Sequence, residues 1–233
     1  HAATGRPDDR TIRRMTRTSQ PRLLVLAVLV VTLSTLPVFL TGAAFFQIGP
    51  ELGIGPLGLG ALTAAFFLTA AAVSPRLGKW VEKVGWHKAM RVNVVCSALL
   101  AALIGPLARD VWSLGGLLVA GAIAYGISNP AANQALAQHT SPARAATVFG
   151  IKHAGIPSST LVAGLAVPAV VVHFGWRAAF FFAPLLAVVV WALIPRNLAV
   201  PQRDDEPVPQ RARLSSSDLR RLAIVAALGA MAA

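Results

Sequence analysis

Six apolar stretches, each long enough to cross a lipid bilayer, limit what this chain can fold into. A transmembrane helix needs about 20 apolar residues, because the hydrocarbon core is about 30 Å thick and a helix rises about 1.5 Å per residue. Lipid offers the backbone no hydrogen-bond partners, so each stretch is expected to form a helix. A β-barrel is excluded because segments such as "LLVLAVLVV" do not alternate between polar and apolar residues. The stretches run roughly over residues 23–46, 57–75, 90–108, 112–136, 146–172 and 177–195.

The bulk composition points to the same class of protein. Hydrophobic residues make up 55% of the 233-residue chain, and charged residues make up only 13%. A soluble domain carries about 25% charged residues. The net charge of +12 could indicate a nucleic-acid partner, but the basic residues are sorted by segment rather than gathered on one solvated face, so none is expected. The single cysteine, Cys96, lies in an apolar stretch and excludes an internal disulfide.

The positions of lysine and arginine predict the orientation of the chain. Nineteen of the 21 lie in the N-terminal tail, in or beside the second-to-third and fourth-to-fifth connections, or after the sixth stretch. The other side holds only Arg109 and Arg177. Cytoplasmic connections are rich in Lys and Arg, so we expect a multi-pass protein of the inner (plasma) membrane with its N-terminus in the cytoplasm.

Four segments are expected along the chain. Residues 1–21 form a basic cytoplasmic tail, and residues 22–195 form a six-helix unit. Residues 196–221 are rich in Pro, Arg and acidic side chains, so they are expected to form a cytoplasmic linker. Residues 222–233 are apolar and indicate the start of a truncated seventh helix. Because the chain begins at His1 and ends inside this apolar run, it is expected to be a fragment that lacks a second half.

A short sequence motif that occurs twice suggests how the six helices are organised. "VGWHKAM" at residues 84–90 and "FGWRAAF" at residues 174–180 both place Gly-Trp and a basic residue before an apolar helix. The predicted orientation puts them on opposite sides of the membrane. Two inverted repeats of three helices would produce this arrangement. The predicted fold class is therefore an all-α membrane protein with six transmembrane helices in two inverted three-helix repeats, plus the start of a seventh helix.

The charged connection between the second and third stretches resembles a family signature. Residues 78–90, "GKWVEKVGWHKAM", are similar to the signature loop of the Major Facilitator Superfamily, in which glycines flank an acid and a base. The residues that match are Gly78, Glu82, Lys83 and Gly85, followed by Lys88. The chain departs from the family pattern in having Glu82 for the usual aspartate and Trp86 where a basic residue is more common. The resemblance covers residues 22–233 and implies a twelve-helix transporter of which this chain is the N-terminal half.

The family resemblance implies that this loop latches the cytoplasmic side when the transporter opens outward. Gly78, Glu82, Lys83, Gly85 and Lys88 are then residues of a cytoplasmic gate rather than ligands of the solute. The alternative is that the basic residues only set the orientation of the chain, and both interpretations can hold together.

Polar side chains inside the stretches are candidates for a solute cavity, because they are costly in a membrane. Lys152 and His153 lie about 9 Å into the fifth stretch, and Lys152 could attract an anionic solute or instead extend to the cytoplasmic interface. Asn129 and Asn133 share one face of the fourth stretch, where they could line the cavity or bond between helices. No Asp or Glu lies inside the six stretches, so proton coupling would need His153 or the missing half.

Small residues in the fifth stretch predict close helix packing. Gly155, Ser159 and Ala163 recur every four residues, and small residues at this period let helices approach one another. Pro157 is expected to make the helix bendable. Drug–proton antiporters of the family carry Gly-Pro in the fifth helix and an arginine in the fourth. Ile156 separates Gly155 from Pro157 here and the fourth stretch has no Arg, which counts against that subclass.

Other classes of function find little support in the sequence. We find no phosphate-binding glycine-lysine loop, no His-x-x-x-His metal pair and no nucleophile with its base, so neither an enzyme, a cofactor nor a metal site is expected. The expected partners are a small-molecule solute, the lipid bilayer and a C-terminal six-helix half. A membrane scaffold or sensor that moves no solute stays open as the alternative.

Overall fold

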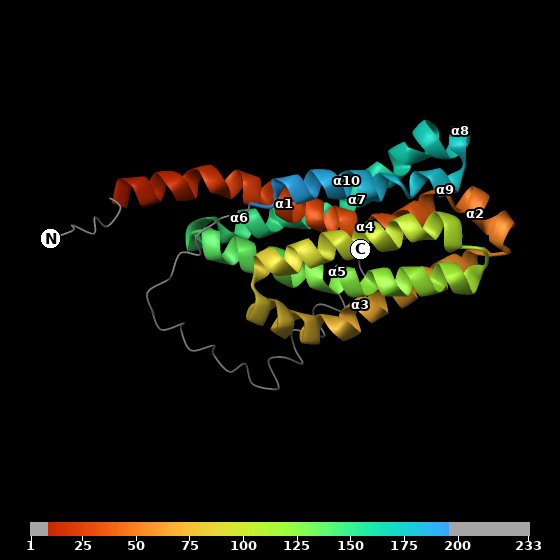
Figure 1. Cartoon of the computed structure of the whole chain (residues 1–233), viewed down its shortest axis with the longest axis horizontal. Coiled ribbons are helices and arrows are strands. Elements are labelled where there is room, and N and C mark those ends of the chain that lie inside the picture. Colours follow the sequence, from red (N-terminus) through yellow and green to blue (C-terminus); the bar gives the residue numbers. More distant parts are fainter. Residues whose placement is uncertain (1–8, 196–233) are drawn as a thin grey trace. The chain divides into compact units, whose positions relative to one another are not determined.

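The computed structural model describes the backbone of residues 9–195, and the side chains of residues 21–195 except Pro142. The predicted linker at 196–221 and the start of a seventh helix at 222–233 lie outside the described residues. Within the described range all regular elements are helical (Figure 1). They are α1 (Asp9–Ala43), α2 (Phe45–Leu52), α3 (Pro56–Val84), α4 (Trp86–Leu107), α5 (Val111–His139), α6 (Pro142–His153), α7 (Gly155–Ala166), η1 (Val167–Val171), α8 (Val172–Phe174), α9 (Trp176–Ala179) and α10 (Phe182–Leu193).

Six helical segments are long and apolar enough to cross a membrane, in agreement with the sequence. They comprise residues 21–43 of α1, then α3, α4 and α5, then the run 143–174, and a last segment over 176–193. These segments run back and forth side by side (Figure 1). The fold is therefore the expected all-α membrane bundle.

The charged connection between the second and third spans is shorter than the sequence suggested. Helix α3 continues to Val84 and α4 begins at Trp86, so Gly85 alone separates them. The apolar stretch that predicts the second span ends near residue 75. Hydropathy marks where lipid contact ends, whereas the helix continues into the polar region because its backbone bonds do not depend on lipid.

The fifth span is interrupted twice. Ala154 separates α6 from α7, three residues before Pro157, whose ring and missing N–H disturb the preceding turn. Residues Val167–Val171 then form a π-helical turn that contains Pro168, a common cause of such bulges. The Val171 carbonyl oxygen accepts a hydrogen bond from the Gln47 side chain at 3.1 Å.

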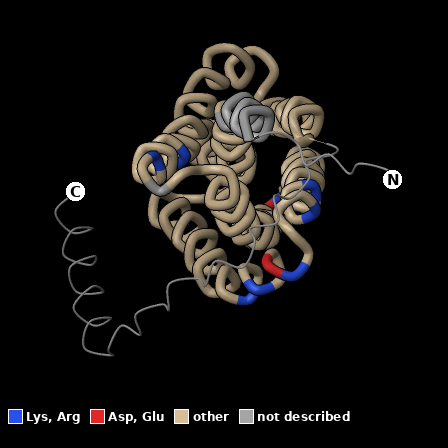
Figure 2. Tube along the Cα trace, turned by 90° about the vertical axis from the view of Figure 1, so that its left-hand side faces the viewer, with Lys and Arg blue, Asp and Glu red and all other residues tan. Residues whose placement is uncertain are grey.

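The two ends of the bundle differ in charge. One end, here called the basic end, holds the α3–α4 and α5–α6 connections and faces the viewer in Figure 2, where basic segments gather. The opposite end holds α2, the α4–α5 connection and the α8–α9 turn (Figure 1). Helix α1 is the most buried of the six spans, and it contacts α4, α5, α6, α7 and α10. The described basic residues of the basic end are Arg22, Arg76, Lys79, Lys83, Lys88, Arg91 and Arg144.

The two Gly-Trp sequences have the same local structure at opposite ends of the bundle. Gly85 has φ 82° and ψ 149°, and Gly175 has φ 80° and ψ 164°, a backbone region that is almost closed to residues with a side chain. The tryptophan that follows, Trp86 or Trp176, is 2% exposed in both cases. An aromatic ring packs edge-on against each indole, from His139 and Phe180 respectively. This correspondence supports the two inverted three-helix repeats that the sequence predicted.

Candidate functional site

The structure brings two of the predicted cavity residues together. The Lys152 Nζ donates a hydrogen bond to the Asn129 Oδ1 at 2.6 Å, which joins α6 to α5. Lys152 is only 2% exposed, so its ammonium group does not reach the solvent at the basic end. The carboxylates among the side chains that the structure describes are Glu51, Glu82 and Asp110, and none of them pairs with Lys152. A buried amine thus has a neutral partner and no opposite charge within the described residues.

Both residues lie well inside their helices. Lys152 is ten residues from the first residue of α6 and Asn129 is ten residues from the last residue of α5, which places each about 15 Å from the basic end of its helix. The distance of about 9 Å expected from the sequence was counted from residue 146, where the apolar stretch begins, rather than from the first residue of α6. The pair therefore lies inside the bundle, in the half nearer the basic end.

The other two cavity candidates do not join this pair. His153 and Asn133 are both exposed in the described chain. His153 follows Lys152 directly, so it points about a quarter turn away around the helix. Asn133 lies one turn from Asn129 and six residues from the basic end of α5.

The charged residues of the signature are exposed at the basic end. Glu82, Lys83 and Lys88 all face outward, and none of them forms an ion pair within the part of the chain that the structure describes. Gly78 lies beside α5, where an added Cβ would be 3.9 Å from the Pro130 Cγ. The signature thus presents free charges at the end of two helices.

Small residues let α7 pack closely on α1. A Cβ on Gly155 would lie 2.9 Å from both the Val28 carbonyl oxygen and the Val31 Cβ. The Thr32 Oγ1 donates to the Gly155 carbonyl oxygen at 3.0 Å, and the Ser159 Oγ donates to the Thr32 carbonyl oxygen at 3.1 Å. Ser159 also bonds to the Thr35 hydroxyl. Gly155 and Ser159 therefore form the contact itself, whereas Pro157 on the same helix is exposed.

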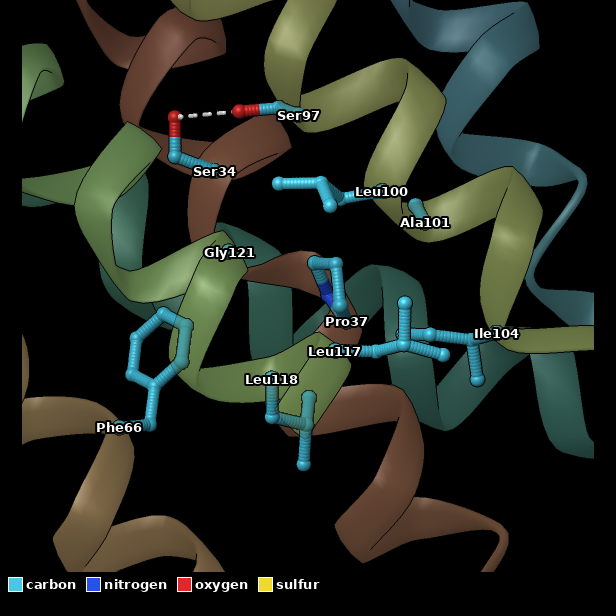
Figure 3. Close-up of a pocket in the computed structure, with 10 residues that line it drawn as sticks. All are labelled: Ser34, Pro37, Phe66, Ser97, Leu100, Ala101, Ile104, Leu117, Leu118 and Gly121. Carbon is cyan, nitrogen blue, oxygen red and sulfur yellow. Dashed lines mark hydrogen bonds between the residues drawn. The ribbon is translucent and has the colours of Figure 1, made fainter. Parts of the chain in front are cut away.

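A buried polar network links α1, α4 and α5, and sequence reasoning missed it. Asn93 is fully buried, and its Nδ2 donates to the Ala124 carbonyl oxygen at 2.6 Å. Its Oδ1 accepts a hydrogen bond from Ser34 at 3.1 Å, and Ser97 bonds to Ser34 at 3.4 Å (Figure 3). The sequence feature that could have indicated this network is the asparagine inside the apolar stretch "VNVVCS".

A small cavity adjoins this network. Figure 3 shows it between Ser34 and Ser97 on one side and apolar side chains on the other. It offers about 10 Å³ to the centre of a water molecule, which is room for about one water. The cavity is too small for a solute, so it does not mark the solute site.

A second group of polar residues, the Glu51 clamp, lies at the opposite end. It consists of Glu51, Trp176 and Arg177. The Glu51 carboxylate accepts a hydrogen bond from the Trp176 Nε1 at 2.6 Å and pairs with the Arg177 guanidinium. These bonds hold the pKa of Glu51 below its ordinary value of 4.5, first through Trp176 and then through Arg177. Arg177 also donates to the carbonyl oxygens of Gly105 at 3.0 Å and Ala108 at 3.2 Å. The clamp thus connects α2, the end of α4 and α9.

Within the described residues, no three His, Cys, Asp or Glu side chains gather in a way that could hold a metal ion. The buried Lys152 and Asn129 offer hydrogen bonding and a positive charge inside the bundle.

Comparison with known proteins agrees with this picture. The chain matches the Major Facilitator Superfamily over residues 27–233. It is similar in structure to a bacterial homolog of the human lysosomal transporter Spinster, solved in an inward-facing and unoccupied conformation, with a TM-score of 0.62 and 18% sequence identity. That likeness covers 78% of this chain and 45% of the other chain, so this chain spans less than half the length of that relative. A search of curated proteins finds no significant match.

The family match extends over most of the sequence and includes the signature at residues 78–90 that first suggested it. The structure adds six membrane-spanning helices and two Gly-Trp turns in inverted positions. Together these findings show that this multi-pass membrane protein belongs to the Major Facilitator Superfamily.

Proposed function

We propose that this chain is the N-terminal six-helix half of a secondary transporter that moves a small solute by alternating access. The observation that carries the proposal is the family match over residues 27–233. It is supported by a fold like that of a transporter of which this chain covers 45%. In such an arrangement one six-helix half rocks against the other around a central site.

The proposed setting is the inner membrane, with the basic end in the cytoplasm. Seven basic residues with described side chains lie at this end, whereas the opposite end has Arg109 and Arg177. This asymmetry supports a cytoplasmic N-terminus, because cytoplasmic connections carry the excess of Lys and Arg.

The signature residues form the cytoplasmic gate in this proposal. Glu82, Lys83 and Lys88 are exposed and without an ion pair in the described part of the chain, so they are free to pair with a second half. Gly78 and Gly85 shape the segment, since Gly78 lies beside Pro130 and Gly85 makes the turn into α4.

The proposed solute is an anion that binds near Lys152 and Asn129. A lysine buried inside a membrane bundle is costly unless an opposite charge approaches it. Lys152 has a neutral partner in Asn129, and its ammonium group has further N–H donors to offer. A carboxylate or phosphate that reached this pair would supply the missing charge. His153 and Asn133 are proposed as outer residues of the cavity because both are exposed.

The two candidate functions, transporter and scaffold, differ in whether the cavity opens to both sides. We would replace Cys96 by Ser and Asn129, at the proposed solute site, by Cys, then treat the reconstituted protein with a membrane-impermeant maleimide from either side. A transporter that works by alternating access should be labelled from both sides. A tightly bound anion should change the ratio of labelling from one side to labelling from the other. Labelling from one side only would contradict alternating access and favour a scaffold or sensor.

A further inference from the structure

An apolar groove runs along the outside of the bundle between α4 and α10. Its walls run from Val94 to Ala102 on α4 and from Pro184 to Trp191 on α10, and its volume is about 460 Å³. All of its lining side chains are apolar. Several of them, including Val95, Leu99 and Val188, are more than half exposed in the described chain. The two helices thus leave these lining side chains uncovered, and the groove is open along its length.

A positive charge lies at the mouth of the groove. The Arg91 guanidinium carbon lies 5.7 Å from the centre of the Trp191 ring, a cation–π distance, and this pair joins α4 to α10 at the basic end. Arg91 precedes Val94 and Val95 by three and four residues, so it lies above them on the same face of the helix. Lys88 lies one further turn toward the basic end and is exposed. Arg91 has no ion-pair partner among the described residues.

The length of the groove matches one leaflet of a bilayer. Arg91 and Ala102 are eleven residues apart, or about 16 Å along α4. One leaflet contributes about 15 Å to the hydrocarbon core. Trp191 lies at the end where an interfacial tryptophan is expected. The groove therefore begins at the interface and ends near the middle of the membrane.

We propose that this groove binds one anionic phospholipid of the leaflet at the basic end, with the headgroup phosphate at Arg91 and an acyl chain between α4 and α10. Three observations support a lipid over a protein partner: the wholly apolar lining, the single-leaflet length and the positive charge placed only at the mouth. A helix from another chain would cross both leaflets, and it would gain nothing from a charge at that position. On the proposed orientation, the basic end faces the cytoplasmic leaflet, whose surface is negative. The proposal does not depend on which solute is moved.

The proposal is tested by native mass spectrometry of the detergent-purified protein, titrated with phosphatidylglycerol or with phosphatidylcholine. We expect phosphatidylglycerol to be retained in preference to phosphatidylcholine. The variant Arg91→Gln should reduce phosphatidylglycerol retention at least fivefold, whereas Arg76→Gln, which removes an exposed charge from the same end on α3, should change it less than twofold. Equal losses in these two variants would mean non-specific attraction of anionic lipid to the basic end and would overturn the site.

A groove-filling variant separates a lipid from other occupants. Ala98→Phe should reduce retention of both lipids, whereas Ala64→Phe, at an exposed position on α3 outside the groove, should leave it unchanged. If Ala98→Phe instead lowered the oligomeric state with lipid retention intact, the occupant would be a second copy of the chain. If it lowered only the unfolding temperature, the rest of the protein would cover the groove. Either result would overturn the proposal.

Discussion

The buried Lys152 shows how the position of one residue along a helix decides the surroundings of its charge. Its side chain could have extended to the basic end, as lysines near helix ends do. The structure instead holds its ammonium group on Asn129 at 2.6 Å, with 2% of the residue exposed. Ten residues of helix separate it from the start of α6, and this distance is what prevents the ammonium group from reaching water.

Replacing Lys152 by Gln should weaken anion binding if the proposed solute site is correct. Hydrogen bonds to charged groups contribute about 1.5–3 kcal/mol, so the affinity for a transported anion should fall about tenfold or more. The measurement is uptake of a panel of radiolabelled carboxylates and phosphate esters into proteoliposomes. Arg144→Gln, at an exposed position of α6, is the matched control. A lower unfolding temperature with unchanged uptake would make Lys152 only a link between α5 and α6.

The substitution Gly155→Ala tests how closely α7 packs on α1, because it adds a single methyl group at the contact. Gly155→Ala places a Cβ 2.9 Å from the Val28 carbonyl oxygen, so α7 must move away from α1. We expect a loss of about 1–3 kcal/mol in the free energy of unfolding, as for other overpacked cores. Thermal unfolding in detergent micelles measures this loss. Gly164→Ala lies on the same helix with nothing within 4 Å of its Cβ, so it should be neutral or slightly stabilising. Equal effects of the two substitutions would refute the close contact.

At the scale of elements, the Glu51 clamp holds together parts of the chain that are distant in sequence. Arg177 contacts α2 through Glu51, and it contacts the end of α4 through the carbonyl oxygens of Gly105 and Ala108. Its guanidinium carbon also lies 4.3 Å from the centre of the Trp176 ring. One side chain thus satisfies backbone oxygens at a helix end that have no partner within the helix.

Replacing Arg177 by Gln should loosen this end of the bundle. The variant loses the ion pair and leaves two carbonyl oxygens without their donor, so we expect the free energy of unfolding to fall by about 1–2 kcal/mol. Arg109→Gln removes an exposed charge from the same end and should change it by less than about 0.5 kcal/mol. The measurement is the midpoint of thermal unfolding of both variants. Similar midpoints for Arg177→Gln and Arg109→Gln would show that the clamp adds no stability.

The clamp should also give stability a defined dependence on pH. Because the folded-state pKa of Glu51 lies below its ordinary value of 4.5, the clamp stabilises the protein above that pH. Its contribution is lost as the pH falls through the lowered folded-state pKa. Glu51→Gln should therefore have a lower unfolding midpoint than the wild type at pH 7, and the gap should narrow as the pH falls below 4.5 and through the lowered folded-state pKa. A gap that stays constant down to pH 3 would contradict the assignment.

At the scale of the whole molecule, the two Gly-Trp turns show the inverted repeat most directly. Each turn has a glycine with positive φ, then a buried tryptophan, then a helix that crosses the membrane. The surroundings differ in one respect: Trp176 donates its Nε1 to Glu51, whereas the Nε1 of Trp86 has no hydrogen-bond partner among the described residues. The Glu51 clamp thus joins elements at the opposite end through a bond that Trp86 does not make among the described residues.

Alanine substitutions at Gly85 and Gly175 should lower the free energy of unfolding by similar amounts, although the two positions lie at opposite ends of the bundle. Each would force a side chain into a backbone region that costs about 1–3 kcal/mol. Gly116→Ala on α5, where nothing lies within 4 Å of the added Cβ, is the control and should not destabilise the protein. The three midpoints of thermal unfolding test this prediction, and a large effect at one turn only would argue against equivalent roles.

Most of the architecture could be predicted from the sequence because the membrane imposes simple rules. Length and apolar character marked the six spans, since a bilayer has a fixed thickness and demands internal backbone bonds. The distribution of Lys and Arg separated the two ends, and residues 78–90 pointed to the family. Periodicity of small residues also singled out Gly155 and Ser159, which do lie between α7 and α1.

The side-chain partners could not be predicted in the same way, because they depend on how helices rotate and how far they extend. Nothing near Asn93 in the sequence indicates Ser34, and nothing near Glu51 indicates Arg177, more than 120 residues later. Lys152 and His153 are adjacent in the sequence, yet packing of α6 buries one and exposes the other. The sequence by itself determined the spans, because these follow from partition between water and lipid, and its residues 78–90 indicated the family. Only the tertiary structure decided which polar groups meet, because that depends on the relative rotation and depth of neighbouring helices.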